Sequence, residues 1–323
     1  MRLRTFFVML LMAAAMPAMA QNAPVAPAAQ GVRAPEQEPG LRKPLGPADL
    51  IMPHITDART MELPCFNRDW SCEVKLPSWP VRIGSTTIDM GPTKHVVFML
   101  LAAALCLLVM VGTARAHVRA SEAHGHPTGM AAGLESVVLY LRNEIFLPSL
   151  GPHGDAYVPF VLTLFFFILF MNLMGLIPYG STPTGNVSVT ATLALCAFVA
   201  TETAGMKAQG LGYMKTIVYW PSDMPVAMKL PLTLVMTPVE IIGKFTKPFA
   251  LTIRLFANMI AGHVIVLAMI GLVFTFGSWF IAPAPIAMAI GIMILEVLVS
   301  FIQAFIFALL AAVFIGQIRA AHH

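Results

Sequence analysis

Charged and titratable side chains are rare in the C-terminal part of the sequence, and each is therefore a candidate for function. Residues 231–316 contain only five Asp, Glu, Lys or Arg residues, which are Glu240, Lys244, Lys247, Arg254 and Glu296. A charge in the apolar core of a membrane costs about 2.5–3.5 kcal/mol on insertion scales, so such residues mark functional sites by default. Carboxylates and the imidazole of His263 can accept and release protons, whereas Arg254 keeps its charge. This combination suits proton transfer past a fixed positive charge.

The spacing of these residues predicts which of them share a helix face. Glu240, Lys247 and Arg254 are seven residues apart and form one stripe on a helix, with a drift of about 20° per step. Asn258 extends that stripe by one turn. His263 follows Arg254 by nine residues, which places it on the opposite face at about 100° per residue. We therefore expect His263 and Arg254 to face different spaces.

A second polar stripe occurs in the last apolar run. Glu296, Ser300 and Gln303 follow a spacing of four and then three residues, so they lie on one face of a helix. Hydrogen bonding between helices is the alternative role for Ser300 and Gln303, and for Ser300 we favour it.

The composition places these residues in a membrane protein. Of the 323 residues, 58% are hydrophobic and 11% are charged, whereas soluble domains carry about 25% charged residues. The net charge of +4 is too small and too scattered for a nucleic-acid-binding surface. The sequence contains no Walker loop and no HExxH motif, so we expect no nucleotide site, cofactor or metal.

The apolar runs predict an all-α integral membrane protein with about five transmembrane helices and an amphipathic surface helix. The expected transmembrane helices are at about 95–113, 157–178, 187–206, 231–276 and 284–317, and the interfacial helix is at 134–147. The last two runs would measure roughly 67 and 46 Å as helices, against a hydrocarbon core of about 30 Å. They must therefore tilt steeply or break. Pro238 and Pro248 allow either outcome, and a break at Pro248 would bring Arg254 close to the lipid headgroups.

The N-terminal part carries targeting signals. Residues 1–20 resemble a secretory signal peptide, for which an uncleaved anchor is the alternative. Residues 21–93 would then be an exported, periplasmic segment, with a first half that is disordered because it is polar and rich in proline. Cys65 and Cys72 could form a disulfide there or remain free thiols. The membrane domain would be 94–318.

Basic residues predict the orientation. Arg115 and Arg119 directly follow the first span, and the positive-inside rule places them in the cytoplasm. Lysines in the loop after the third span agree with this orientation. We therefore expect a multi-pass protein of the cell inner membrane with a periplasmic mature N-terminus and a cytoplasmic C-terminus.

Several motifs in order resemble one family. LTIRLFANMIAGH at 251–263 resembles the signature of subunit a of the F-type ATP synthase membrane sector. The likeness extends to MNLMGLIP at 171–178, to Glu240 with Lys247 and Pro248, and to QAFIFALL at 303–310.

The resemblance implies a proton-translocating stator subunit. Arg254 would separate two aqueous half-channels and release the proton from a passing c-subunit carboxylate, with Asn258 positioning or hydrating that contact. The half-channel open to the exterior would be lined by His263, Glu296 and Gln303, and the one open to the cytoplasm by Glu240. The last two helices would form a long tilted hairpin against the c-ring.

The same resemblance implies the partners, which are the c-ring, the peripheral-stalk b subunits, the rest of the ATP synthase complex, membrane lipid and the translocated H⁺. Two other classes of function remain as alternatives. An intramembrane metalloenzyme would use His263 and Glu296 with a further ligand, and a secondary transporter would show paired broken helices. His124-Gly125-His126 could bind a metal weakly, although a flexible loop is the better interpretation. Coupling to H⁺ or to Na⁺ stays open.

Overall fold

The structure is a computed structural model, and it describes residues 56–64, 71–83, 86–89, 91–122, 128–177, 180–210, 212–213, 225–278 and 280–320. Several predictions lie outside these residues. They are the signal peptide at 1–20, the disordered first half of the exported segment, the state of Cys65, and the His124-Gly125-His126 motif.

Five helices in the described part of the chain are long and apolar enough to cross a membrane. They are α3 (Lys94–Glu122), α6 (Val158–Gly175), α7 (Val187–Gln209), α8 (Val226–Phe276) and α9 (Pro283–Ala320). The prediction of an all-α membrane protein with about five transmembrane helices is confirmed. Both α3 and α8 extend beyond the apolar runs from which they were predicted.

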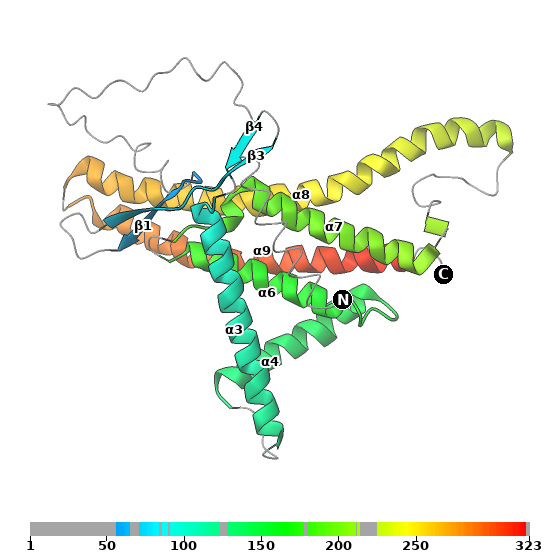
Figure 1. Cartoon of the computed structure of the whole chain (residues 1–323), viewed down its shortest axis with the longest axis horizontal. Coiled ribbons are helices and arrows are strands. Elements are labelled where there is room, and N and C mark those ends of the chain that lie inside the picture. The colour runs from blue at the N-terminus through cyan, green and yellow to red at the C-terminus, as the bar shows by residue number, and fades with distance from the viewer. Residues whose placement is uncertain are drawn as a thin grey trace.

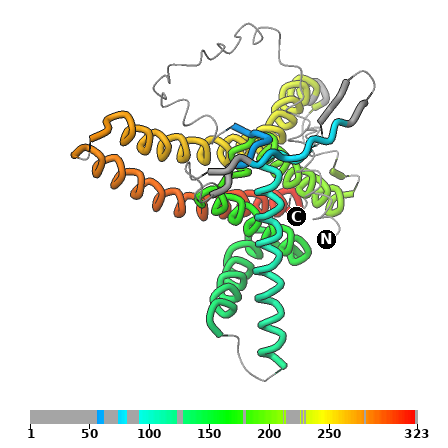
Figure 2. The backbone as a smooth tube through the Cα atoms, turned by 60° about the vertical axis from the view of Figure 1, so that its left-hand side comes forward, coloured from blue at the N-terminus to red at the C-terminus, as the bar shows by residue number. Residues whose placement is uncertain are grey.

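The two longest helices form an antiparallel pair. In Figures 1 and 2 α8 and α9 run side by side along the molecule, whereas α3 crosses their direction. Gly277 ends α8 in the left-handed conformation (φ 57°), which glycine adopts without strain and which lets the chain reverse into α9. At about 76 and 57 Å, neither helix fits a hydrocarbon core of about 30 Å along the membrane normal.

Prolines do not break α8. The helix is continuous through Pro231, Pro238 and Pro248, and Figure 1 shows it curving towards its N-terminal end. A proline inside a helix removes one backbone hydrogen bond and bends the axis without having to end the helix. The alternative of a break at Pro248 is therefore wrong, and Arg254 lies about 33 Å from the nearer end of α8.

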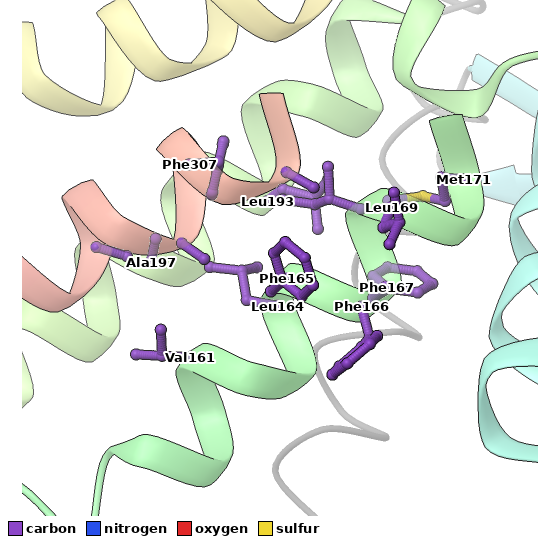
Figure 3. Packing of buried hydrophobic residues seen from close by; sticks show 14 of the residues in the cluster. Val161, Leu164, Phe165, Phe166, Phe167, Leu169, Met171, Leu193, Ala197 and Phe307 are labelled. Atoms are coloured by element: carbon purple, nitrogen blue, oxygen red, sulfur yellow. The ribbon is translucent and has the colours of Figure 1, made fainter. Parts of the chain in front are cut away.

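The hydrophobic core is built mainly from α6, α7 and α9, with further residues from α3, α8 and the segment before α6. Figure 3 shows Leu164 and Phe165 of α6 gathered with Leu193 and Ala197 of α7 and Phe307 of α9. In the most apolar window of each helix, 61% of the α6 residues are buried but only 11% of the α8 residues. The helix that carries Arg254 thus leaves most of its apolar surface free for lipid or a partner.

The interfacial helix differs from the prediction of one helix at 134–147. The segment consists of α4 (Met130–Tyr140), a π-helical turn η2 (Leu141–Phe146) and α5 (Leu147–Leu150). The Leu147 N–H donates to the Arg142 carbonyl, five residues back, just before Pro148, which has no N–H to continue the α-helical pattern. Helix α4 has no buried residue, as a surface helix requires.

Two β-hairpins precede α3, in the segment predicted to be exported, and they were not predicted from the sequence. β1 (Thr60–Pro64) pairs with β2 (Ser71–Lys75), and β3 (Pro80–Ile83) pairs with β4 (Thr86–Asp89), both antiparallel. The Lys94 N–H donates to the Ala58 carbonyl over 3.0 Å. This bond holds the segment before β1 against the first turn of α3.

Candidate functional site

His263 and Glu296 meet between the two long helices. His263 Nδ1 of α8 lies 3.7 Å from Glu296 Oε1 of α9. On its other side, the His263 ring hydrogen-bonds through Nε2 to the hydroxyl of Thr182. Thr182 directly precedes η3 (Pro183–Gly185), the single 3₁₀ turn that leads into α7. The imidazole is therefore held between a carboxylate and a hydroxyl, as a proton-transfer group can be.

Two glycines allow these side chains to come close. A Cβ at Gly262 would overlap the carboxylate of Glu296 and lie 2.8 Å from its Cδ atom. A Cβ at Gly175 would overlap the hydroxyl of Thr182 and lie 2.6 Å from its Cβ atom. The backbones of α8 and α6 can approach the site to these distances only because both positions lack a side chain.

A buried network holds α6, η3 and α9 together beside Glu296. Asn172 is fully buried; its Nδ2 donates to the Ser300 carbonyl over 3.3 Å, and its Oδ1 accepts from the Thr184 hydroxyl over 2.7 Å. Ser300 therefore takes part in bonding between helices, through its backbone. Its hydroxyl has no hydrogen-bond partner within the described residues.

Arg254 points to the outer surface of α8. Its side chain is exposed, and in the described part of the chain it forms no ion pair. It lines an open cavity of about 520 Å³ together with Gly243, Lys247 and Phe314. The Nδ2 atom of Asn258, one turn further on, is buried and has no hydrogen-bond partner among the described residues. The charge of Arg254 therefore faces the lipid or the partner protein that covers this surface of α8.

A second polar region lies on the other side of Arg254 along α8. Glu240 lines a cavity of about 330 Å³ with Glu202, Lys244 and Lys247. Lys244 Nζ lies 3.5 Å from Glu202 Oε2 and donates to the Tyr213 hydroxyl over 2.8 Å. Acidic and basic groups thus line one cavity between α7, α8 and α9.

The predicted site residues lie in three separate regions along α8. Glu240 lies about 21 Å from Arg254 on one side and His263 lies about 14 Å from it on the other, at 1.5 Å per residue. The cavity beside Glu240 and the cavity beside Arg254 share Lys247, whereas His263 and Glu296 line neither. Gln303 is half-buried on α9, and within the described residues no hydrogen bond or ion pair joins it to the His263–Glu296 pair. Within the described residues, no third His, Cys, Asp or Glu joins that pair at metal-binding distance.

Several polar residues of the site were not found from the sequence. Thr182, Thr184, Asn172 and Glu202 lie in short loops or singly inside apolar helices, without a repeating pattern. Their partners are distant in sequence: 81 residues separate Thr182 from His263, and 128 separate Asn172 from Ser300. The one available signal was that Asn172 belongs to the motif MNLMGLIP.

Comparison with known proteins gives one consistent result. The model of the family described as ATP synthase A chain matches residues 96–316. ATP synthase subunit a of Anaeromyxobacter dehalogenans strain 2CP-C is 41% identical over 284 residues, which cover 85% of this chain and 71% of that protein. ATP synthase subunit a 2 of Chlorobium luteolum is 38% identical over 336 aligned positions, which cover 97% of this chain and 94% of that protein.

Proposed function

Because this chain belongs to the ATP synthase A chain family, we propose that it is the proton-translocating stator subunit of an F-type ATP synthase membrane sector. It would give protons access to a rotating c-ring through two aqueous half-channels and thereby couple proton flow to ATP synthesis. Its partners would be the c-ring, the peripheral-stalk b subunits and the remainder of the complex.

One observation carries the proposal, namely the position of Arg254 between two separate polar regions of the same helix. His263 and Glu296 form one region, which would belong to the half-channel open to the exterior together with Gln303. Glu240 and its cavity form the other, which would open to the cytoplasm. A proton cannot pass along α8 from one region to the other through Arg254, since a guanidinium neither releases its proton nor accepts another.

The path therefore leads through the partner ring. A proton that arrives by way of His263 and Glu296 would neutralise a ring carboxylate, and a neutral carboxyl group enters lipid at far lower cost than an ionised one. After nearly a full rotation the same carboxyl group would reach Arg254. The positive charge favours the ionised carboxylate, so the proton leaves towards Glu240. Each charge that crosses 100 mV carries about 2.3 kcal/mol, so several protons are needed for each ATP.

The expected topology is consistent with proton flow from the exterior to the cytoplasm. With one crossing for each of the five long apolar helices, the start of α3 and the end of α9 would lie on opposite sides of the membrane. The complex would lie in the cell inner membrane. Arg119, in the last turn of α3, would then be cytoplasmic, and the β-hairpins would be periplasmic. A secondary transporter would instead need paired broken helices, whereas α8 and α9 are both continuous.

Photo-crosslinking tests the proposal directly. A benzophenone amino acid at Ala250, an exposed position one turn before Arg254, should form an adduct with the ring subunit in illuminated membranes. The same amino acid at Leu108, which is 71% exposed on α3, serves as the matched control and should give no ring adduct. The tagged chain should also co-purify with the ring and the peripheral stalk. Purification of the chain alone, or ring adducts equal at both positions, would overturn the proposal.

A further inference from the structure

A group of buried polar side chains lies at the start of α3, outside the site described above. Thr93, Lys94 and His95 are 1%, 6% and 2% exposed. Both ring nitrogens of His95 are buried and have no hydrogen-bond partner among the residues that the structure describes. Buried polar groups of this kind are normally paired with protein or with ordered water, so an unpaired imidazole points to water beside it.

The exported segment fixes the position of His95. The His95 backbone N–H donates to Asp57 Oδ1 over 3.4 Å, and Asn186 Nδ2 donates to Asp57 Oδ2 over 3.2 Å. Asn186 caps α7, because its side-chain oxygen accepts from the Ser188 N–H over 2.9 Å. One carboxylate from the exported segment thus joins the first turns of two membrane helices.

This cluster adjoins His263. The short segment that begins with Thr182, the hydroxyl partner of His263, ends at Asn186, the amide partner of Asp57. Helix α3 packs against η3, which lies between these two residues. His95 and His263 are also close enough for their charges to interact. The buried hydroxyl of Ser181, which directly precedes this segment, is a further polar atom without a partner in the described chain.

Building on the proposed function, we propose that His95 is a further proton-transfer residue, placed between exterior water and His263. Its imidazole accepts a proton from exterior water on one ring nitrogen and releases the proton of the other nitrogen to water on the His263 side. A half-turn of the neutral ring then exchanges the positions of its two nitrogens, so the step leaves no net change on the residue. Asp57 holds the backbone of His95 in place and attracts the transient positive charge of its ring, whereas Lys94 and a protonated His263 repel that charge and favour release of the proton.

The test measures ATP synthesis by membrane vesicles under an imposed proton gradient. His95→Ala and His95→Gln should slow synthesis roughly tenfold. That is less than the 100-fold or more that a positioned acid-base group contributes to catalysis, because water can bypass one relay group. Added imidazole should restore part of the rate in His95→Ala. His117→Ala, an exposed position near the other end of α3 that pairs with Glu135 at 3.1 Å, is the control and should keep the normal rate.

Two results would overturn the inference. One is a normal rate in His95→Gln, because glutamine can replace the packing and hydrogen bonding of histidine but cannot relay a proton. The other is a slow His95→Ala variant whose rate imidazole leaves unchanged, which indicates a structural role alone. Arg254→Ala is measured in parallel. Normal ATP synthesis in that variant would contradict the proposed function itself. Loss of ATP synthesis in Arg254→Ala together with normal synthesis in the His95 variants would contradict only the role of His95.

Discussion

At the scale of single residues, Arg254 differs from the other polar groups of α8 in what it touches. His263 contacts Thr182 and Glu296, and Glu240 lines the cavity between α7, α8 and α9, whereas Arg254 is exposed in an open cavity beside α9 and has no ion-pair partner in the described chain. An unpaired charge at a membrane-facing surface is costly unless a partner supplies the counter-charge. A ring carboxylate would supply it, so the lack of an internal partner is consistent with a charge that acts on another subunit.

Replacement of the relay residues should have a graded effect. His263→Ala removes the bond to Thr182 and the contact with Glu296, and Glu296→Ala removes the carboxylate. Each variant should slow ATP-driven proton uptake by inverted vesicles without abolishing it, since water can replace one relay group. Uptake at the normal rate in both variants would remove these residues from the path.

Sequence reasoning identified the charged residues but not their neutral partners. The spacing of nine residues correctly separated His263 from the face of Arg254, because helix periodicity needs no knowledge of the fold. Thr182 and Asn172 could not be found in this way, since their contacts depend on how distant segments pack. A single hydroxyl or amide in an apolar segment gives no periodic signal.

At the scale of helices, the close approach of Glu296 on α9 to the backbone of α8 depends on one glycine, Gly262. Gly262→Ala would place a methyl group on the carboxylate of Glu296 and push it away from His263. We expect slower proton transport with normal assembly of the complex. The additional change Glu296→Asp, which shortens the side chain by one methylene group, should recover part of the rate.

The control lies on the same helix. Gly271→Ala adds the same methyl group to α8 where no other atom lies within 4 Å, so transport should be unchanged. If Gly271→Ala and Gly262→Ala slowed transport equally, the effect would come from the backbone of α8, and the close approach of Glu296 would not explain it.

The number of membrane spans was more predictable than the ends of the helices. Long apolar runs predict spans because the membrane sets a minimum length, and five spans were found. Whether Pro248 bends or breaks α8 depends on packing with α9, which the sequence does not display. The β-hairpins were missed because short paired strands carry little signal beside a proline-rich composition.

At the scale of the whole molecule, the long hairpin presents an apolar face with a charge near its middle. Large apolar side chains beside Arg254 are well exposed, among them Val239 at 58% and Ile242 at 64%, which line the same cavity. Helices α6 and α7 pack against the hairpin, whereas only 11% of the residues in the most apolar window of α8 are buried. A stator needs this asymmetry, because one side must be fixed while the other contacts a moving partner.

The most direct test of the account is ATP synthesis in vesicles that carry Arg254→Ala, with a proton gradient imposed across the membrane. The account predicts no synthesis above background while the assembled complex can still be isolated, because without the fixed charge protons are no longer forced through rotation. Lys207→Ala, which removes an exposed charge in the last turn of α7, should leave synthesis unchanged. Synthesis at the normal rate in Arg254→Ala would contradict the central claim.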